Sequence, residues 1–236
     1  MYLPYDVFNL IIHYADMLTT LHLYNVDQTI RKLCCSPYMT ALLEYRRTEF
    51  FNPYATSTLL DDFLNDLTLK DDVFKREIQL LFGQLLTKNR QFIMLVDKRN
   101  GKSTFVNLIR MVMGHRFLRG NIDECDLFKE ADVVNITGAI NIGRLKSLIA
   151  KDEFLTRYGR YRPDHHIIVD MNDLNNPNET IFRRGSAIRF RTRYSQRGSD
   201  KTDKKPIDYE LFSKLKDRHV LGAFLNFLLL GLKNEG

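Results

Sequence analysis

FIMLVDKRNGKSTFVNLIRMVMG, residues Phe92–Gly114, joins a short apolar run to a segment with helical spacing. Phe92–Val96 predicts a buried strand, and the apolar residues after Lys102 recur every three or four positions, as on one face of a helix. A polar turn that ends in Gly101 lies between the two. Strand, turn, Gly-Lys-Ser and helix are together the layout of a phosphate-binding P-loop, where backbone N–H groups and the positive end of a helix hold phosphate oxygens.

Five consecutive residues of this motif are candidate nucleotide ligands: Asn100, Gly101, Lys102, Ser103 and Thr104. In a P-loop the lysine neutralises phosphate charge and the serine hydroxyl coordinates Mg²⁺, so ATP and Mg²⁺ are the cofactors that the motif allows. Ser103 is a metal ligand only if a magnesium nucleotide binds. The alternative is that Gly-Lys-Ser is retained as a helix-starting turn, because the glycine that the full motif needs five residues before Gly101 is Val96.

The composition is that of a globular protein, with 236 residues of which 44% are apolar and 27% charged. No run approaches the roughly 20 apolar residues of a membrane span, and the start MYLPYDVF lacks the features of a signal peptide. Three cysteines without a CxxC pair indicate reduced thiols in an intracellular protein. The formal charge of +6 favours an anionic partner.

The order of apolar segments predicts an α/β fold with a central, mostly parallel sheet. Further strands are expected at Val133–Ile136, His166–Asp170 and Ile188–Phe190, helices over residues 58–88 and 207–233, and a connection over 115–130. Turn formers at Phe51–Ser57 mark a boundary, which divides the chain into a small all-α module, residues 1–50, and a P-loop domain, residues 58–236.

The first fifty residues resemble an F-box, in a Leu-Pro start followed by apolar residues at helical spacing. This resemblance implies docking on a Skp-type adaptor of a cullin ubiquitin ligase through Leu3, Pro4, Val7, Ile11, Leu21 and Val26. The alternative is an ordinary helical subdomain that packs on the rest of the chain.

From about Leu59 to the end, the order of motifs resembles the superfamily 3 helicases, especially the primase-helicases of poxviruses and related large DNA viruses. The matching segments are Asn100–Phe105 (NGKSTF), Leu145–Arg162 before the family's DNA-contacting hairpin, Met171–Leu174, and Phe182–Phe190. The resemblance implies an AAA+-like P-loop domain. If the domain is active, it implies a γ-phosphate sensor at Asn172 and an arginine finger at Arg183 or Arg184.

The sequence departs from this family where hydrolysis takes place. In the family the second strand ends in acidic residues that hold Mg²⁺ and polarise the attacking water. Here Val133–Ile136 is followed by Thr137-Gly138, and Asp132 precedes the strand and would lie at its wrong end. Val96 and Lys98 also replace loop glycines. Whether the chain is an enzyme stays open, and a degenerate ATPase is favoured over an ATP-dependent helicase.

Two basic segments are candidate nucleic-acid contacts, since arginines beside tyrosines offer phosphate contacts and stacking surfaces. They contribute Arg157, Tyr158, Arg160, Tyr161, Arg162, Arg191 and Arg193. The alternative for such charged runs is a solvated surface. The pair His165-His166 is interpreted as structural, because adjacent residues of a strand point to opposite faces and cannot share a metal.

These observations lead to a hypothesis of a viral accessory factor for DNA replication and late gene expression. An F-box-like module would recruit the ubiquitin-ligase adaptor. The helicase-like domain would bind either DNA, with single-stranded DNA as one option, or a protein target. The size and start also resemble late expression factor seven of baculoviruses, which implies a nuclear host-cell protein that works with viral replication proteins and without a membrane. The alternatives are a small ring-forming, DNA-stimulated ATPase or helicase, and a DNA-binding scaffold without enzymatic activity.

Overall fold

A computed structural model describes residues 36–46, 48–122, 131–138, 142–150, 154–156, 159–161, 163–171, 185–196 and 204–233 of the chain. The helices are α3 (Pro37–Tyr45), α4 (Thr58–Thr68), α5 (Asp72–Gly83), α6 (Lys102–Met113), α7 (Ile142–Ala150), α9 (Leu211–Leu215) and α10 (Arg218–Lys233), with 3₁₀ turns η1 (Gln84–Leu86) and η2 (Gly114–Arg116). The strands are β1 (Phe92–Val96), β2 (Phe117–Gly120), β3 (Val133–Ile136), β4 (Phe154–Thr156), β5 (Gly159–Tyr161), β6 (His166–Met171), β7 (Ser186–Ile188), β8 (Arg193–Ser195) and β9 (Lys204–Pro206). In the described part of the chain, no helix is long and apolar enough to cross a membrane.

Five strands form a central sheet in the order β2-β3-β6-β1-β7, and all four neighbouring pairs are parallel. The P-loop strand β1 therefore lies between β6 and β7, and Leu95 is paired with Asp170 on one side and Ile188 on the other. Because the strands are parallel, all their carboxyl ends meet at one edge of the sheet, where the loop after β1 also lies. The predicted α/β fold with a mostly parallel sheet is confirmed.

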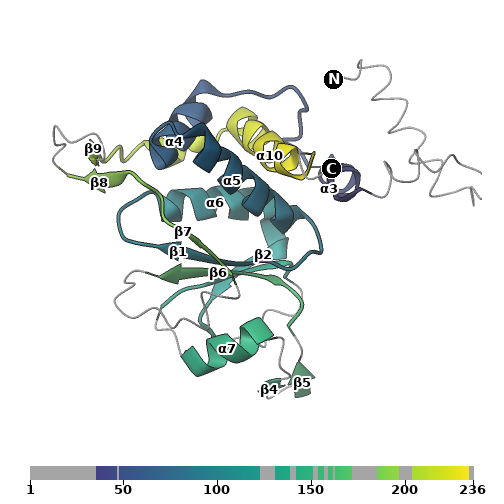
Figure 1. Ribbon diagram of the computed structural model, residues 1–236. Helices are drawn as coiled ribbons and strands as arrows, with labels where there is room; N and C mark the ends of the chain where they lie inside the picture. The colour runs from purple at the N-terminus through teal and green to yellow at the C-terminus, as the bar shows by residue number, and fades with distance from the viewer. Residues whose placement is uncertain are drawn as a thin grey trace, which may run out of the picture.

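Both faces of the sheet are covered by helices, which explains why β1 is apolar throughout. Ile93 and Leu95 belong to a core shared with α4, α5, α6 and α10, whereas Phe92 and Met94 pack with residues of α7 on the other face. Figure 1 shows α4, α5, α6 and α10 on one side of the sheet and α7 on the other. Because successive side chains of β1 point to opposite faces of the sheet, this strand contributes residues to both hydrophobic cores.

The larger helical layer is centred on Phe105 of α6, whose ring makes edge-to-face contacts with Phe82, Phe190 and Phe224. Serine and aspartate caps start the neighbouring helices: Ser57 accepts a hydrogen bond from Leu60 N, and Asp71 accepts one from Phe74 N. The first turn of α4 and the first turn of α5 are thereby each stabilised by the side chain of the residue that precedes the helix.

Helices α5 and α10 cross with their backbones in contact. A Cβ atom added to Gly231 would lie 2.1 Å from the carbonyl oxygen of Gln79, and one added to Gly83 would lie 2.6 Å from that of Leu228. These distances are shorter than any van der Waals contact, so only glycine fits at the crossing. Gln79 Nε2 also donates to Phe227 O across it, at 2.9 Å.

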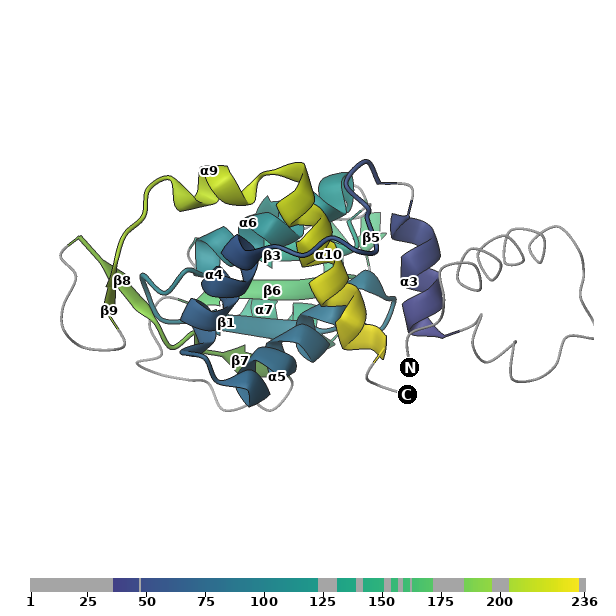
Figure 2. The same cartoon turned by 90° about the horizontal axis from the view of Figure 1, so that it is seen from above.

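Helix α3 is the described part of the predicted N-terminal module, and it packs on α10. Figure 2 shows α3 beside α10, at the end of the protein away from the β8–β9 pair. Arg116 joins α3 to the sheet layer: its guanidinium contacts Glu44 at 2.5 Å, the Tyr45 hydroxyl at 3.2 Å, and Asp132. Within the predicted all-α module of residues 1–50, the helix Pro37–Tyr45 is present, while residues 1–35 lie outside the described residues.

Several short strands were not predicted from the sequence. The segment 115–130 was predicted as a connection, but Phe117–Gly120 is the edge strand β2 of the sheet. Within the segment Leu145–Arg162, Phe154–Thr156 and Gly159–Tyr161 form the antiparallel pair β4 and β5. Lys204–Pro206, before the predicted C-terminal helices, is β9, which pairs with β8. All these strands have three or four residues, too few for periodicity to identify them.

Candidate nucleotide-binding site

The loop between β1 and α6 has the backbone of an anion-binding turn. Three of its residues have positive φ angles, namely Asp97 at 70°, Arg99 at 58° and Gly101 at 85°. Val96 is the last residue of β1 and Lys98 has no positive φ, so the two positions where this sequence lacks the glycines of the motif are not the left-handed positions of the loop. Besides Gly101, the left-handed conformation occurs at Asp97 and Arg99. Aspartate adopts this conformation more readily than most residue types, whereas arginine adopts it rarely.

The segment from β7 to β8 holds this loop in place. Arg189 Nε lies 2.8 Å from a carboxylate oxygen of Asp97, and Tyr194 N donates to Arg99 O at 2.6 Å. The Tyr194 ring also packs against Gly101, where an added Cβ would lie 3.3 Å from it. These contacts offset the strain of the two non-glycine residues with positive φ.

Lys102, the first residue of α6, is only 5% exposed. Its ammonium lies 2.5 Å from Asp170 Oδ1, and it donates to Leu95 O at 3.2 Å and Met171 O at 3.3 Å. All three partners are at the carboxyl ends of β1 and β6. The lysine of the motif is therefore held at the sheet edge by one carboxylate and two carbonyl groups.

Asp170 is a candidate site residue that sequence reasoning missed. It follows the buried residues Ile167, Ile168 and Val169 on β6, and its side chain is 20% exposed. The sequence pattern of the helicase family predicts a carboxylate after the strand Val133–Ile136, and that strand is one position further from β1 in the sheet than β6. Only the strand order shows that β6 is the neighbour of the P-loop.

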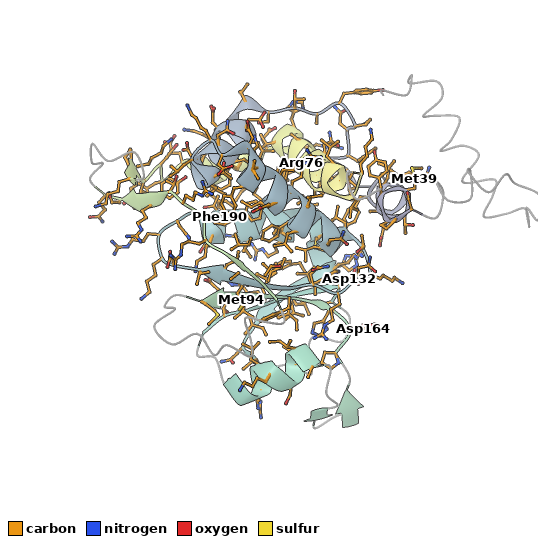
Figure 3. The ribbon with its side chains drawn as sticks, viewed as in Figure 1. Met39, Arg76, Met94, Asp132, Asp164 and Phe190 are labelled. Atoms are coloured by element: carbon orange, nitrogen blue, oxygen red, sulfur yellow. The ribbon has the colours of Figure 1, made fainter. Side chains whose placement is uncertain are left out.

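Asp132 lies where the sequence predicted, at the amino end of β3. Its carboxylate contacts Arg116 and not the P-loop. Figure 3 shows Asp132 at the end of the sheet away from the β8–β9 pair, near Asp164. This carboxylate is therefore excluded from the chemistry of the P-loop.

Asn100 is 1% exposed and belongs to the wall of the same site. Its Nδ2 donates to Val96 O at 2.9 Å, but among the described residues its Oδ1 has no hydrogen-bond partner. An unsatisfied buried acceptor costs free energy, about 1–3 kcal/mol. Such an atom is explained if a ligand, a cation or a water completes its hydrogen bonding.

A pocket of about 300 Å³ opens above the loop. It is lined by the loop and helix start (Lys98, Arg99, Asn100, Gly101, Lys102, Ser103, Thr104), two carboxylates (Asp170, Asp208) and apolar or aromatic side chains (Phe63, Tyr194, Ile207, Leu211). Basic groups, hydroxyl groups, a helix N-terminus and carboxylates are the groups that a magnesium nucleotide requires, and apolar walls suit a nucleobase. The residues present thus fit such a ligand, and all five candidate nucleotide ligands lie together.

The remaining predicted site residues are only partly described. Arg191 Nη1 lies 2.7 Å from Asp71 Oδ2, and its guanidinium stacks on Phe74, so it is engaged within the fold. Arg193 is exposed on β8. The backbone of Arg160 and Tyr161 forms β5. The residues Arg157, Tyr158, Arg162, Asn172, Arg183 and Arg184, and the six candidate adaptor contacts Leu3, Pro4, Val7, Ile11, Leu21 and Val26, lie outside the described residues.

The adjacent histidines are buried at the amino end of β6. His166 Nδ1 accepts a hydrogen bond from Gln91 N at 3.0 Å, and Nε2 lies 2.7 Å from Thr87 O, an arrangement that requires the neutral ring. Burial lowers the pKa of His166, and it lowers the pKa of His165 to about 4. Among the described residues no group of three or more His, Cys, Asp or Glu side chains could hold a metal ion.

The fold is similar to solved structures of the C-terminal region of NrS-1. The A form apo structure gives a TM-score of 0.51 at 14% identity and covers 76% of this chain and 48% of that one. The apo structure of residues 305–718 gives 0.51 at 14% identity, with 77% and 48% covered, and the A form apo structure of the same residues gives 0.53 at 13%, with 77% and 47% covered. This chain thus spans about half the length of the NrS-1 region. No family model matches the chain, and no curated protein is similar to it in sequence. At this identity the likeness shows the fold alone.

Proposed function

We propose that this protein is a nucleotide-binding, helicase-like accessory factor in the replication of a DNA virus. The observation that carries the proposal is the pocket above the β1–α6 loop, where Lys102, Ser103, Asn100 and the start of α6 converge. The resemblance of the motifs to viral superfamily 3 helicases supports the biological setting. The fold shared with the C-terminal region of NrS-1 is consistent with it.

In this proposal each residue of the pocket has a physical role. The N-terminal N–H groups of α6 and the positive φ at Gly101 present the backbone to phosphate oxygens. Lys102 exchanges one of its present partners for phosphate, and the apolar wall around Tyr194 covers the base or sugar. A magnesium nucleotide, when bound, supplies the phosphate charge that these groups neutralise.

Nucleotide binding is tested by titrating the protein with a fluorescent ATP analogue in the presence of Mg²⁺. We expect saturable binding by the wild type and a loss of about tenfold or more in affinity for Lys102→Ala, since charge-assisted hydrogen bonds contribute about 1.5–3 kcal/mol. Lys75→Ala is the matched control, because Lys75 is also an ion-paired lysine, with Asp61 at 3.3 Å, and lies outside the pocket. Absence of saturable binding by the wild type, or equal affinity of the two variants, would contradict the proposal.

Nucleic-acid binding is the second part of the proposal. It is favoured by the β4–β5 pair, which places the backbone of Arg160 and Tyr161 in an antiparallel ribbon, and by the exposed Arg193. We expect binding to single-stranded DNA that weakens steeply with added salt, because phosphate contacts release counterions. Arg193→Ala should weaken this binding while Arg191→Ala, whose guanidinium is paired with Asp71, should have a smaller effect.

The ubiquitin-ligase role rests on residues 1–35 and on sequence resemblance alone. We propose adaptor binding through Leu3 and Pro4, tested by pull-down of a Skp-type adaptor with the wild type beside the Leu3→Ala/Pro4→Ala variant. Failure of the intact chain to bind an adaptor removes this role and leaves the nucleotide proposal unaffected.

A further inference from the structure

We infer that Asp170 is the cation-binding carboxylate of the phosphate pocket and takes the role that superfamily 3 helicases give to an acid on another strand. The inference rests on the proposed nucleotide binding and goes beyond it, because it assigns a metal ligand and a way to retain Mg²⁺ dependence. In the pattern of that family the acid follows the strand that corresponds to β3, where this chain has Thr137 and Gly138.

The strand order places Asp170 on the strand that pairs directly with the P-loop strand β1. β6 is the direct neighbour of β1, with Asp170 paired to Leu95, whereas β3 is separated from β1 by the whole width of β6. Asp170 lines the same pocket as Ser103 and Thr104, and Thr137 does not line it. A carboxylate at this position therefore faces the phosphate site directly.

Two carboxylates line the pocket among the described residues, and they differ in their surroundings. Asp208 is exposed in the segment before α9, accepts a hydrogen bond from Glu210 N at 2.8 Å and lies 3.7 Å from Lys214 Nζ. Its contacts are local to that segment. Asp170 is four-fifths buried, on a strand inside the sheet, and it contacts Lys102. Of the two, Asp170 is the carboxylate that is carried by a strand of the central sheet.

The chemistry of the pocket supports a cation between Asp170 and bound phosphate. Mg²⁺ takes oxygen ligands and is held in proteins by one or two carboxylates together with phosphate oxygens and water. Asp170 and the Ser103 hydroxyl offer such oxygen atoms, and the buried Oδ1 of Asn100 lies in the same wall without a partner among the described residues. Without nucleotide, Lys102 neutralises Asp170. When phosphate binds, Lys102 pairs with phosphate and the cation takes over the neutralisation of Asp170.

A purely structural role for Asp170, as an anchor for Lys102, makes a different prediction. Loss of an anchor would weaken nucleotide binding equally with and without Mg²⁺. Loss of a cation ligand would weaken only the part of the affinity that depends on Mg²⁺. The comparison of the two conditions thus separates the roles.

The experiment measures the affinity for a fluorescent, non-hydrolysable ATP analogue in Mg²⁺ and in EDTA for the wild type, Asp170→Asn, Asp170→Glu and Asp132→Asn. Asp132→Asn is the matched control, because it also removes the charge of an ion-paired aspartate at a strand end but on the far edge of the sheet. Circular dichroism melts show which variants are folded. Asp170→Glu keeps the charge beside Lys102 but moves the carboxylate, so it remains informative if Asp170→Asn fails to fold.

We expect Mg²⁺ to strengthen binding by about tenfold or more in the wild type and in Asp132→Asn, which is the lower end of the loss that mutation of a residue supporting a metal usually causes. In Asp170→Asn and Asp170→Glu this enhancement should fall to less than about threefold, with affinity in EDTA changed little. An Mg²⁺ enhancement retained in the folded Asp170 variants, or absent from a wild type that binds the analogue in EDTA, overturns the inference and leaves nucleotide binding standing. A wild type that binds no analogue in either condition overturns both.

Discussion

The contact between Lys102 and Asp170 allows a quantitative prediction about stability without any ligand. Lys102 is 5% exposed, and its ammonium lies 2.5 Å from Asp170 Oδ1. We consider Lys102→Met, which keeps the apolar stem and removes the charge, and Asp170→Asn, which keeps the shape and removes the charge. Each leaves the partner without its counter-charge at the edge of the sheet.

The magnitude follows from burial. Removal of one partner from a buried ion pair costs about 3–5 kcal/mol. The Asp170 side chain is 20% exposed, so water can hydrate a carboxylate left without Lys102, and we expect the lower end, about 3 kcal/mol, for Lys102→Met. In Asp170→Asn the amide oxygen can still accept from Lys102, whose two carbonyl contacts remain, which reduces the cost to about 2 kcal/mol. The double variant should cost about 3 kcal/mol, so the coupling energy is about 2 kcal/mol.

Chemical denaturation of the four proteins, followed by circular dichroism, measures these free energies. For a chain of this length a loss of 2 kcal/mol lowers Tm by about 4–8 °C, so Asp170→Asn is also visible in a melting curve. Effects of the two single substitutions that add within about 0.5 kcal/mol would refute the reasoning, since the contact would then contribute nothing of its own. An unchanged Tm for Asp170→Asn would refute it as well.

Three further predictions concern the backbone and the buried histidines. Gly231→Ala should destabilise the protein by more than about 2 kcal/mol, because the new Cβ would overlap Gln79 O at the helix crossing; denaturation measures it, and a loss below 1 kcal/mol would contradict it. In Gly101→Ala the new Cβ would lie 2.6 Å from Leu67 Cδ2 at a residue with positive φ, so the substitution should lower the free energy of unfolding by about 1–3 kcal/mol and weaken nucleotide binding. Unchanged stability would contradict this prediction, because it would show that the loop relaxes freely. Burial lowers the pKa of His165 to about 4, so as pH falls the unfolded chain takes up a proton on this ring before the folded protein does. The free energy of unfolding should therefore be independent of this group above about pH 6.5 and fall by about 1.4 kcal/mol per pH unit between there and pH 4. His165→Gln should reduce that decline, and an unchanged pH profile would contradict the assignment.

The fold was predictable wherever one segment carried its own signal. β1 has the predicted bounds Phe92–Val96, α6 begins at Lys102, and the strand Val133–Ile136 is present with the same residues. In each case a buried apolar run or a helical stripe is long enough to be read from the chain itself. β2 was missed because Arg119 and Gly120 interrupt its short apolar start, and it becomes a strand only through pairing with β3.

The site was predictable as far as the motif reached. Asn100–Thr104 was found because a P-loop is continuous in sequence. Asp170 was not, because it is 68 residues after Lys102 and its proximity depends on β6 lying beside β1, a property of strand order that periodicity does not contain. The pairing of Arg191 with Asp71 was hidden for the same reason, since the two residues are 120 positions apart.

The attachment of the β1–α6 loop to the β7–β8 segment has a thermodynamic consequence. Because Tyr194 N is bonded to Arg99 O and Arg189 to Asp97, a ligand that alters the backbone of the loop must either break these bonds or move β8 with it. β8 also carries Arg193. If nucleotide changes the affinity of β8 for DNA, then DNA must change the affinity for nucleotide by the same factor, since the two binding free energies are linked. Tyr194→Phe, which keeps both the backbone bond and the ring, should preserve the size of that factor, while Arg189→Ala should bring it closer to one.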